Sequence, residues 1–292
     1  MPPGPGHSKP GEALRKREEA GAVPDLYLGR MTRQHQRTQR ILVTGSSRGI
    51  GRAAALALAA RGDHVILAAR NEAALAQVAS QIREAGGSAE VVVVDVTDDR
   101  SVAAAAERVL ATGPIDVLVN NAGFASQVPF LAQDGERARA EVEVNYLGAL
   151  RMARAFLPSM IAARRGTIVN VSSLLGAIPA PASANYSATK AALNAWSHAL
   201  RGEIAPHGIK VVVFMPSHTD TEAGKSTRFE GVHVLPVAYV VKELLRAIDR
   251  KPRSWVSSPI FRMFVRLAGI FPAWAERQML KSTKHALALP AR

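Results

Sequence analysis

The stretch ILVTGSSRGIG at residues 41–51 decides the fold of this chain. It begins with an aliphatic run typical of a strand that is buried on both faces, and the Ala-rich segment Arg52–Arg61 that follows it is typical of a helix. Between them, Gly45, Gly49 and Gly51 carry no Cβ that would keep the backbone away from a pyrophosphate. The helix N-terminus behind them offers free N–H groups. A glycine turn between the first strand and the first helix predicts a dinucleotide-binding site.

The rest of the chain repeats this alternation of short apolar runs and helical stretches. Strands are expected at Arg40–Val43, His64–Ala68, Ala89–Val94, Val117–Val119, Thr167–Val171, Lys210–Phe214 and Trp255–Ser257. Helices are expected at Arg52–Arg61, Glu72–Ala85, Ser101–Leu110, Ala138–Ala163 and Ser183–Ala205. Such alternation predicts an α/β fold, a Rossmann-type doubly wound parallel sheet of about seven strands with helices on both faces.

Charge and composition restrict the class of partner. The chain has 292 residues and a net charge of +13, of which +4 lies in residues 1–40 and +7 in residues 251–292. The body between them is therefore nearly neutral, which argues against nucleic-acid binding by the folded domain. There are no cysteines, so thiolate metal sites are excluded, and no metal site is predicted.

No segment has the composition of a signal peptide or the roughly 18 apolar residues of a spanning helix. We therefore expect a cytoplasmic protein, with attachment to a membrane surface as the alternative. The domains expected are a disordered basic extension at 1–39, a catalytic domain at 40–258 and a basic, aromatic helical arm at 259–292. Met31, just before the ordered body, is an alternative start.

Three polar residues form a candidate proton-transfer site. Tyr186 and Lys190 are four residues apart, which places both side chains on the same face of a helix. A fixed positive charge favours the phenolate, so the tyrosine could exchange a proton near neutral pH. Ser173, thirteen residues upstream, could hold a substrate oxygen against the phenol. This chemistry suits the interconversion of alcohols and ketones.

Two arginines indicate which dinucleotide is bound. The second expected strand ends at Arg70 and lacks the acidic residue that a free ribose 2′-hydroxyl would require. Arg70 and Arg48 instead supply cations suited to a 2′-phosphate, which predicts NADP(H) rather than NAD. The alternative is that both are solvated surface residues.

Polar residues after the third and fourth strands have competing interpretations. Asp95 could accept a hydrogen bond from an adenine amino group, or it could cap the helix that follows. Asn120 is expected to join neighbouring strands rather than contact substrate. Asn145 lies in an apolar helical stretch, where it is either functional or a satisfied core amide.

Together these motifs resemble the compact, single-domain branch of the short-chain dehydrogenase/reductase family. The resemblance covers about residues 40–258 and rests on TGSSRGIG at 44–51, NNAG at 120–123, Asn145, Ser173 and the YSATK run at 186–190, in the family's order. Their joint occurrence is highly specific.

The resemblance implies a role for each matched residue. Tyr186 would be the general acid or base, Lys190 would lower its pKa and bind the nicotinamide ribose, Ser173 would hold the substrate oxygen, and Asn145 would hold a relay water. The thirteen-residue spacing selects Ser173 over Ser172. Cofactor contacts would come from Gly45, Ser47, Arg48, Gly49, Ile50, Gly51, Arg70, Asp95, Val96, Asn121, Ala122, Gly123, Tyr186, Lys190, Pro216, Thr219 and Thr221.

One position departs from the family pattern. Pro216 is followed by Ser217, where the family usually has glycine, so the cofactor contact there is less secure. Thr221 matches the family threonine that contacts the carboxamide, and Thr219 is a second candidate. His218 is expected to be a loop residue or part of the substrate pocket.

The C-terminal third sets the substrate. Glu222–Val234 is expected to be a mobile loop that closes over substrate. Residues 252–292 contain five of the fifteen aromatics, with basic residues between them, in two short helices broken near Gly269–Pro272. They could form a packing arm, an anchor on anionic lipid, or a lid over an apolar substrate.

The leading hypothesis is an NADP-dependent oxidoreductase acting on a lipid-like ketone or secondary alcohol. A small polar ketone or a 3-oxoacyl thioester is the alternative substrate, and a non-catalytic NADP-binding scaffold is the alternative function. The family resemblance implies a homodimer or homotetramer.

Overall fold

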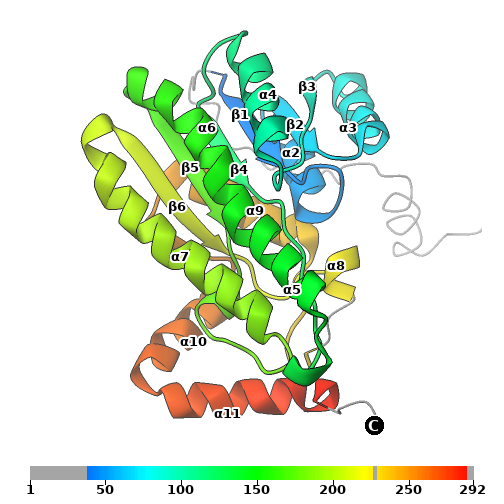
Figure 1. The fold of residues 1–292 in the computed structure, drawn as a ribbon, viewed down its shortest axis with the longest axis vertical. Helices are drawn as coiled ribbons and strands as arrows, with labels where there is room; N and C mark the ends of the chain where they lie inside the picture. Colours follow the sequence, from blue (N-terminus) through cyan, green and yellow to red (C-terminus); the bar gives the residue numbers. More distant parts are fainter. Residues whose placement is uncertain (1–37, 226–228, 288–292) are drawn as a thin grey trace, which may run out of the picture. The chain divides into compact units, whose positions relative to one another are not determined.

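The computed structural model describes residues 38–225 and 229–287, so almost all of the expected extension at 1–39 lies outside the described residues. All seven expected strands are present within one or two residues of their expected bounds. They are β1 (Arg40–Thr44), β2 (His64–Ala69), β3 (Ser88–Val93), β4 (Val117–Asn120), β5 (Gly166–Val171), β6 (Ile209–Met215) and β7 (Ser254–Val256). They form one parallel sheet in the order β3-β2-β1-β4-β5-β6-β7 (Figure 1).

The order of the strands reverses beside β1, which pairs with β2 on one side and β4 on the other. Ile41 lies opposite Val65 in β2 and opposite Val117 in β4. In open α/β sheets, ligands bind at such a switch point, outside the carboxyl ends of the strands. The predicted doubly wound Rossmann-type sheet is therefore confirmed.

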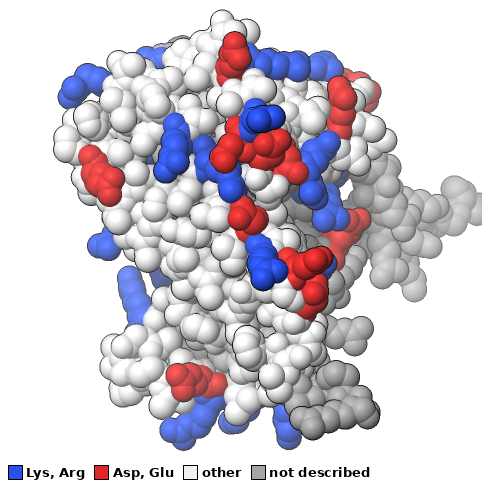
Figure 2. Space-filling model, in the orientation of Figure 1, with Lys and Arg blue, Asp and Glu red and all other residues white. Residues whose placement is uncertain are grey.

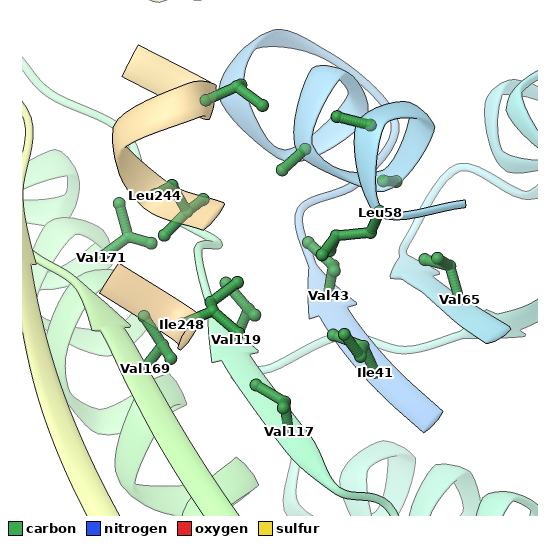
Figure 3. Close-up of a cluster of buried hydrophobic side chains, with 14 of the residues drawn as sticks. Ile41, Val43, Leu58, Val65, Val117, Val119, Val169, Val171, Leu244 and Ile248 are labelled. Carbon is green, nitrogen blue, oxygen red and sulfur yellow. The ribbon is translucent and has the colours of Figure 1, made fainter. Parts of the chain in front are cut away.

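Helices cover both faces of the sheet (Figure 1). α2 (Gly49–Ala60), α3 (Glu72–Glu84) and α9 (Val237–Arg250) pack on one face, and α4 (Asp99–Leu110), α6 (Gly148–Ala162) and α7 (Ala184–Ile204) on the other. Neighbouring strand residues point to opposite faces: Ile41 and Val43 belong to the first cluster (Figure 3), and Leu42 to the second. Burial on both faces explains why these strands are aliphatic without polar alternation.

The helical stretch expected at Ala138–Ala163 is confirmed, except for a local distortion that the sequence did not predict. The structure has α5 (Gly135–Val142), a π-helical turn at Glu143–Leu147 and then α6. A π turn inserts one extra residue into the helix, and such turns are frequent at functional sites. Asn145 lies in this turn and is almost completely buried. Apolar periodicity could not reveal the turn, because the helical pattern continues on both sides of it.

The aromatic arm packs against the carboxyl-terminal strands. It consists of α10 (Pro259–Ile270) and α11 (Pro272–Thr283), which are separated at Phe271 as expected (Figure 1). Ala275 and Met279 of α11 are buried with Val213, Met215 and Val256 of β6 and β7. The expected loop at Glu222–Val234 begins with the short helix α8 (Glu222–Lys225). Short 3-10 segments lie at Phe130–Ala132, Leu174–Gly176, Ala205–His207 and Lys284–Ala286.

Over the face shown in Figure 2, Lys and Arg are interspersed with Asp and Glu rather than gathered in one basic patch. Within the described part of the chain, no helix is both long enough and apolar enough to cross a bilayer.

Candidate active site

A cavity of about 1760 Å³ opens at the carboxyl ends of the strands. The loops after β1 to β6 contribute to its wall, and α7, α10 and α11 complete it. Nearly all the predicted site residues line it, namely Gly45, Ser47, Arg48, Gly49, Ile50, Arg70, Asp95, Val96, Asn121, Ala122, Gly123, Ser173, Tyr186, Lys190, Pro216, Thr219 and Thr221. Gly51 and Asn145 do not belong to the lining, so these two act behind the wall.

The glycine turn at the start of α2 has the geometry of a phosphate cradle. Gly45 and Gly49 have φ values of +65° and +57°, which other residues rarely adopt. A Cβ on Gly51 would lie 2.3 Å from the carbonyl oxygen of Gly45 and 2.4 Å from Nδ2 of Asn121. No side chain caps this helix and its first turn holds no acidic residue, so its N–H groups and dipole suit a phosphate.

Asn121 holds the turn against β4. Its backbone N donates to Thr44 Oγ1 at 2.9 Å, and its Nδ2 donates to the carbonyl of Thr44 at 2.9 Å. Asn120, the residue before it, donates from Nδ2 to Oδ1 of Asn170 at 2.9 Å. This bond joins β4 to β5, as expected for Asn120 from the sequence.

Asp95 and Arg70 lie at the end of the cavity formed by β2 and β3. Asp95 Oδ1 accepts hydrogen bonds from the N and Oγ1 of Thr97, and Oδ2 lies 4.0 Å from the exposed guanidinium of Arg70. Burial acts to raise the pKa of Asp95, but the Thr97 hydrogen bonds and Arg70 outweigh it and lower the pKa. The cap of α4 is Asp98, so Asp95 does not fill that role. Arg48 is also exposed, 3.8 Å from Glu222.

Tyr186, Ser173 and Lys190 meet where α7 passes the end of β5. Tyr186 and Ser173 both line the cavity, and the Ser173 hydroxyl acts to lower the pKa of the Tyr186 phenol. Ser173 Oγ also accepts from the N of Leu175 at 3.1 Å, whereas Ser172 Oγ donates to the carbonyl of Lys190 at 3.2 Å. Ser172 is therefore tied to the helix backbone, and Ser173 is the serine that faces the phenol.

Burial governs the protonation of this group. Burial raises the pKa of Tyr186, the Ser173 hydroxyl lowers it, and the charge of Glu141 raises it further, so the net shift is upward. Burial also lowers the pKa of Lys190 to about 8. The sequence led us to expect that Lys190 would lower the Tyr186 pKa. Instead, the Lys190 ammonium lies 5.8 Å from the centroid of the phenol ring and donates to the Val171 carbonyl at 2.9 Å.

Asn145 fastens the loop after β4 from behind the cavity wall. Its Oδ1 accepts from the N of Phe124 at 2.9 Å, and its Nδ2 donates to the Phe124 carbonyl at 2.8 Å. A Cβ on Gly123 would lie 2.9 Å from Asn145 Oδ1 and 3.4 Å from Lys190 Nζ, so these two groups border the same point. The side-chain amide is thus satisfied within the protein.

The segment after β6 forms the wall opposite the glycine turn. His218 lines the cavity in edge contact with Phe229, and burial lowers its pKa although Asp220 acts to raise it. Thr219 Oγ1 donates to the Ser217 carbonyl at 2.8 Å. The Thr221 methyl group would lie 3.7 Å from a Cβ on Gly49, so Thr221 lies beside the glycine turn.

Known proteins resemble this chain both in sequence and in fold. The family described as "short chain dehydrogenase" matches residues 39–230. The chain belongs to this family. A very-long-chain 3-oxoacyl-CoA reductase from Eremothecium gossypii is 35% identical over 219 residues, which cover 72% of this chain and 62% of that protein. The mouse protein named dehydrogenase/reductase SDR family member 7B is 35% identical over 65% of this chain. The chain matches 60% of the length of the mouse protein.

Among solved structures of the family, a short-chain dehydrogenase from Sphingobium yanoikuyae in complex with NADPH is 30% identical, with a TM-score of 0.72. The match covers 81% of this chain and 94% of that one. The family match covers residues 39–230, whereas the match to this solved structure covers a larger share of the chain. The structural similarity therefore extends beyond the residues that match the family.

Several cavity residues of this short-chain dehydrogenase were not predicted from the sequence. Phe124 lines the cavity after β4, and Arg137 of α5 lies over its ring at 5.2 Å. Ile260, Phe261, Phe264, Trp274 and Met279 line it from the arm. The arm signal was visible in the sequence, but which aromatics face inward depends on how α10 and α11 pack.

Proposed function

We propose that this protein is an NADP-dependent oxidoreductase that interconverts a ketone and a secondary alcohol. The observation that carries the proposal is that Tyr186, Ser173 and Lys190 line the same cavity as the glycine turn of α2. Tyr186 and Ser173 could hold and protonate a carbonyl oxygen, while the glycine turn at the other end of the cavity could hold a dinucleotide. The solved NADPH complex of a relative supports the same cofactor.

In the reduction, Ser173 donates a hydrogen bond to the substrate oxygen and Tyr186 transfers its proton to that oxygen. The raised pKa keeps the Tyr186 phenol protonated at neutral pH, as an acid must be. Bound NADPH supplies the hydride that the carbonyl carbon accepts. Lys190, positively charged below about pH 8, would hold the nicotinamide ribose. The alcohol forms when the oxygen takes the proton.

The glycine turn and the arginines fit the cofactor. The first-turn N–H groups of α2 would hold the pyrophosphate, and Asp95 and Val96 would border the adenine. Arg70 and Arg48 would pair with the 2′-phosphate. Arg70 now lies 4.0 Å from Asp95 and Arg48 lies 3.8 Å from Glu222, and a phosphate would be a stronger partner for both arginines. Asn121, Ala122, Gly123, Pro216, Thr219 and Thr221 would border the nicotinamide half.

Arg70→Ala should weaken NADPH binding about tenfold and leave NADH binding nearly unchanged. A charge-assisted hydrogen bond contributes about 1.5–3 kcal/mol, and the exposure of Arg70 favours the lower end. Calorimetric titration with both cofactors measures the two affinities. Arg100→Ala, which removes an exposed arginine away from the cavity, is the matched control. Equal losses for NADPH and NADH would refute the assignment of the 2′-phosphate.

We propose a lipid-like carbonyl compound as the substrate. Phe261, Phe264 and Trp274 of the arm line the cavity, and Phe264 and Trp274 form an edge contact at 5.1 Å. Such a wall would bury an acyl chain or another extended apolar group. The similarity to a very-long-chain 3-oxoacyl-CoA reductase points the same way. A small polar ketone is the alternative substrate. A non-catalytic scaffold is the alternative function, and the intact Ser173, Tyr186 and Lys190 set disfavours it.

Trp274→Ala should raise KM for a long-chain ketone about tenfold, because burying a large apolar side chain contributes about 1.5–3 kcal/mol. KM for a short-chain ketone should stay unchanged. NADPH consumption with a series of carbonyl compounds of increasing chain length measures both. Phe271→Ala removes an exposed aromatic of the arm that does not line the cavity, and it is the control. An equal change in KM for long and short substrates would contradict the proposal.

The outer face of the arm supports peripheral membrane contact as a further part of this proposal. Met263 and Ile270 lie at helical spacing on α10 and are more than half exposed, next to the exposed Phe271 and the basic Arg266. An apolar face beside basic residues suits an anionic lipid surface. Sedimentation with anionic vesicles tests the membrane contact, and a protein that stays in solution would contradict it.

We also propose a homodimer or homotetramer built on α6 and α7. Light scattering tests this assembly, and a mass equal to that of one chain would contradict it.

A further inference from the structure

A buried carboxylate connects two walls of the cavity. Glu141 lies in the last turn of α5 and its side chain has no exposed surface. One carboxylate oxygen accepts a hydrogen bond from the backbone N of Ser126 at 2.5 Å. The other accepts from Nδ2 of Asn185 at 2.6 Å and from Nε2 of Gln133 at 3.4 Å. Among the described residues, the carboxylate has these donors but no ion-pair partner.

The two main partners of Glu141 adjoin the reacting groups. Asn185 directly precedes Tyr186 in the first turn of α7, and its Nδ2 also donates to the Ala138 carbonyl at 3.1 Å. Ser126 follows Phe124 and Ala125, which line the cavity. The same loop is fixed at Phe124 by Asn145, so it is held at two points from two successive helical segments.

Burying a charge without a counter-ion costs several kcal/mol unless hydrogen bonds compensate for the lost water. A leucine would fill a buried position on α5 without that cost. The carboxylate must therefore contribute something that an apolar side chain does not.

We propose that Glu141 is a positioning residue for Tyr186: its carboxylate fixes the start of α7 and the cavity wall at 124–126 in one arrangement. The inference rests on the proposed function, because it takes Tyr186 as the proton donor. A donor held in one orientation toward the substrate oxygen reacts faster, and a displacement of about 1 Å can cost 100-fold in rate.

The electrostatics of the site support this assignment. After burial, the charge of Glu141 is the other influence that raises the pKa of Tyr186, so it helps to keep the phenol protonated. The cavity lining also holds the charged or titratable groups Lys190 on α7, Arg137 on α5, Glu143 of the π turn and His218 after β6. Arg137 is directed to the same loop, because its Nε donates to Ser126 Oγ at 2.7 Å.

Glu141→Gln removes the charge of the carboxylate, keeps the shape of the side chain and places an amide N–H donor opposite the Asn185 donor. We expect kcat to fall about 10- to 100-fold while the protein stays folded. The pH at which Tyr186 ionises should move down, because the negative charge that opposes the phenolate is gone. An ultraviolet difference titration of tyrosinate, with Tyr186→Phe as the reference, measures this without substrate. Glu136→Gln, which removes an exposed charge from the same helix, should change neither quantity.

An unchanged kcat and an unchanged Tyr186 titration in Glu141→Gln would overturn the proposal. If that variant fails to fold, Asn185→Ala breaks the same contact and leaves the carboxylate in place. It should lower kcat without lowering the pH at which Tyr186 ionises, and a wild-type kcat would refute the positioning role. Because the titration needs no substrate, the two failures can be told apart. An enzyme without carbonyl reductase activity refutes the proposed function, whereas an active enzyme whose kcat and Tyr186 titration are both unchanged in Glu141→Gln refutes this inference.

Discussion

Tyr186→Phe should lower kcat for carbonyl reduction by about 10²- to 10⁴-fold, the usual contribution of a positioned general acid. The substitution removes only the hydroxyl that would donate the proton and leaves the ring beneath Lys190 in place. NADPH affinity should change little, so the loss should appear in kcat at saturating cofactor. Steady-state NADPH consumption together with calorimetric titration separates the two quantities.

The pH dependence provides a second check on this prediction. Because the pKa of Lys190 is about 8 and that of Tyr186 is raised, Lys190 loses its charge first as the pH rises. Wild-type kcat for reduction should therefore decline as the pH passes through about 8.

Tyr239→Phe, at an exposed tyrosine of α9, is the control for Tyr186→Phe and should retain full activity. Wild-type kcat in Tyr186→Phe would contradict the mechanism.

Gly51→Ala should abolish measurable NADPH binding and lower the free energy of unfolding by about 1–3 kcal/mol or more. The new Cβ would meet the Gly45 carbonyl at 2.3 Å and Asn121 Nδ2 at 2.4 Å. Since Gly45 lines the cavity directly, relief of this clash must displace the turn that would hold the pyrophosphate. Thermal unfolding and calorimetric titration with NADPH measure the two effects.

Gly202→Ala is the matched control for the glycine substitution. A Cβ at Gly202, within α7, meets no atom within 4 Å. Alanine in a helix interior is favoured over glycine by about 0.5–1 kcal/mol, so this variant should be equal to or more stable than the wild type. If Gly51→Ala bound NADPH with wild-type affinity, the turn would not be the cofactor cradle.

The sheet could be predicted from the sequence because each strand carries its own local signal. Strands buried on both faces, such as Ile41–Val43 in β1, must be aliphatic throughout, and this pattern is visible without any tertiary contact. The π turn at Glu143–Leu147 has no such signal. Its formation depends on how Asn145 is held by Phe124, twenty-one residues earlier in the chain.

In the candidate site, too, the features with a local sequence signal could be predicted and those that depend on distant contacts could not. The glycine turn and the Tyr186–Lys190 pair are local spacings, and the cavity lies where they predict it. Glu141 also had a signal, because it precedes Asn145 by four residues in a stretch expected to be buried helix. Its partners, Ser126 and Asn185, are distant in the chain, so only the fold reveals what the carboxylate holds.

The protonation of Tyr186 could not be derived from spacing. An i, i+4 lysine suggested a lowered pKa, but the direction depends on burial and on where the ammonium points. Desolvation of a buried phenol outweighs the influence of neighbouring groups here. The result favours an acid at neutral pH, which suits reduction.

In the proposed reaction, hydride passes from NADPH to a carbonyl carbon in this cavity. The most direct measurement uses NADPH labelled with deuterium at the nicotinamide C4, a long-chain 3-oxoacyl thioester as substrate, and mass spectrometry of the product alcohol. We expect one deuterium on the carbinol carbon with the wild-type protein, and transfer that is about 10²- to 10⁴-fold slower with Tyr186→Phe. NADPH binding without deuterium transfer to this or any other carbonyl compound would contradict the proposed reaction.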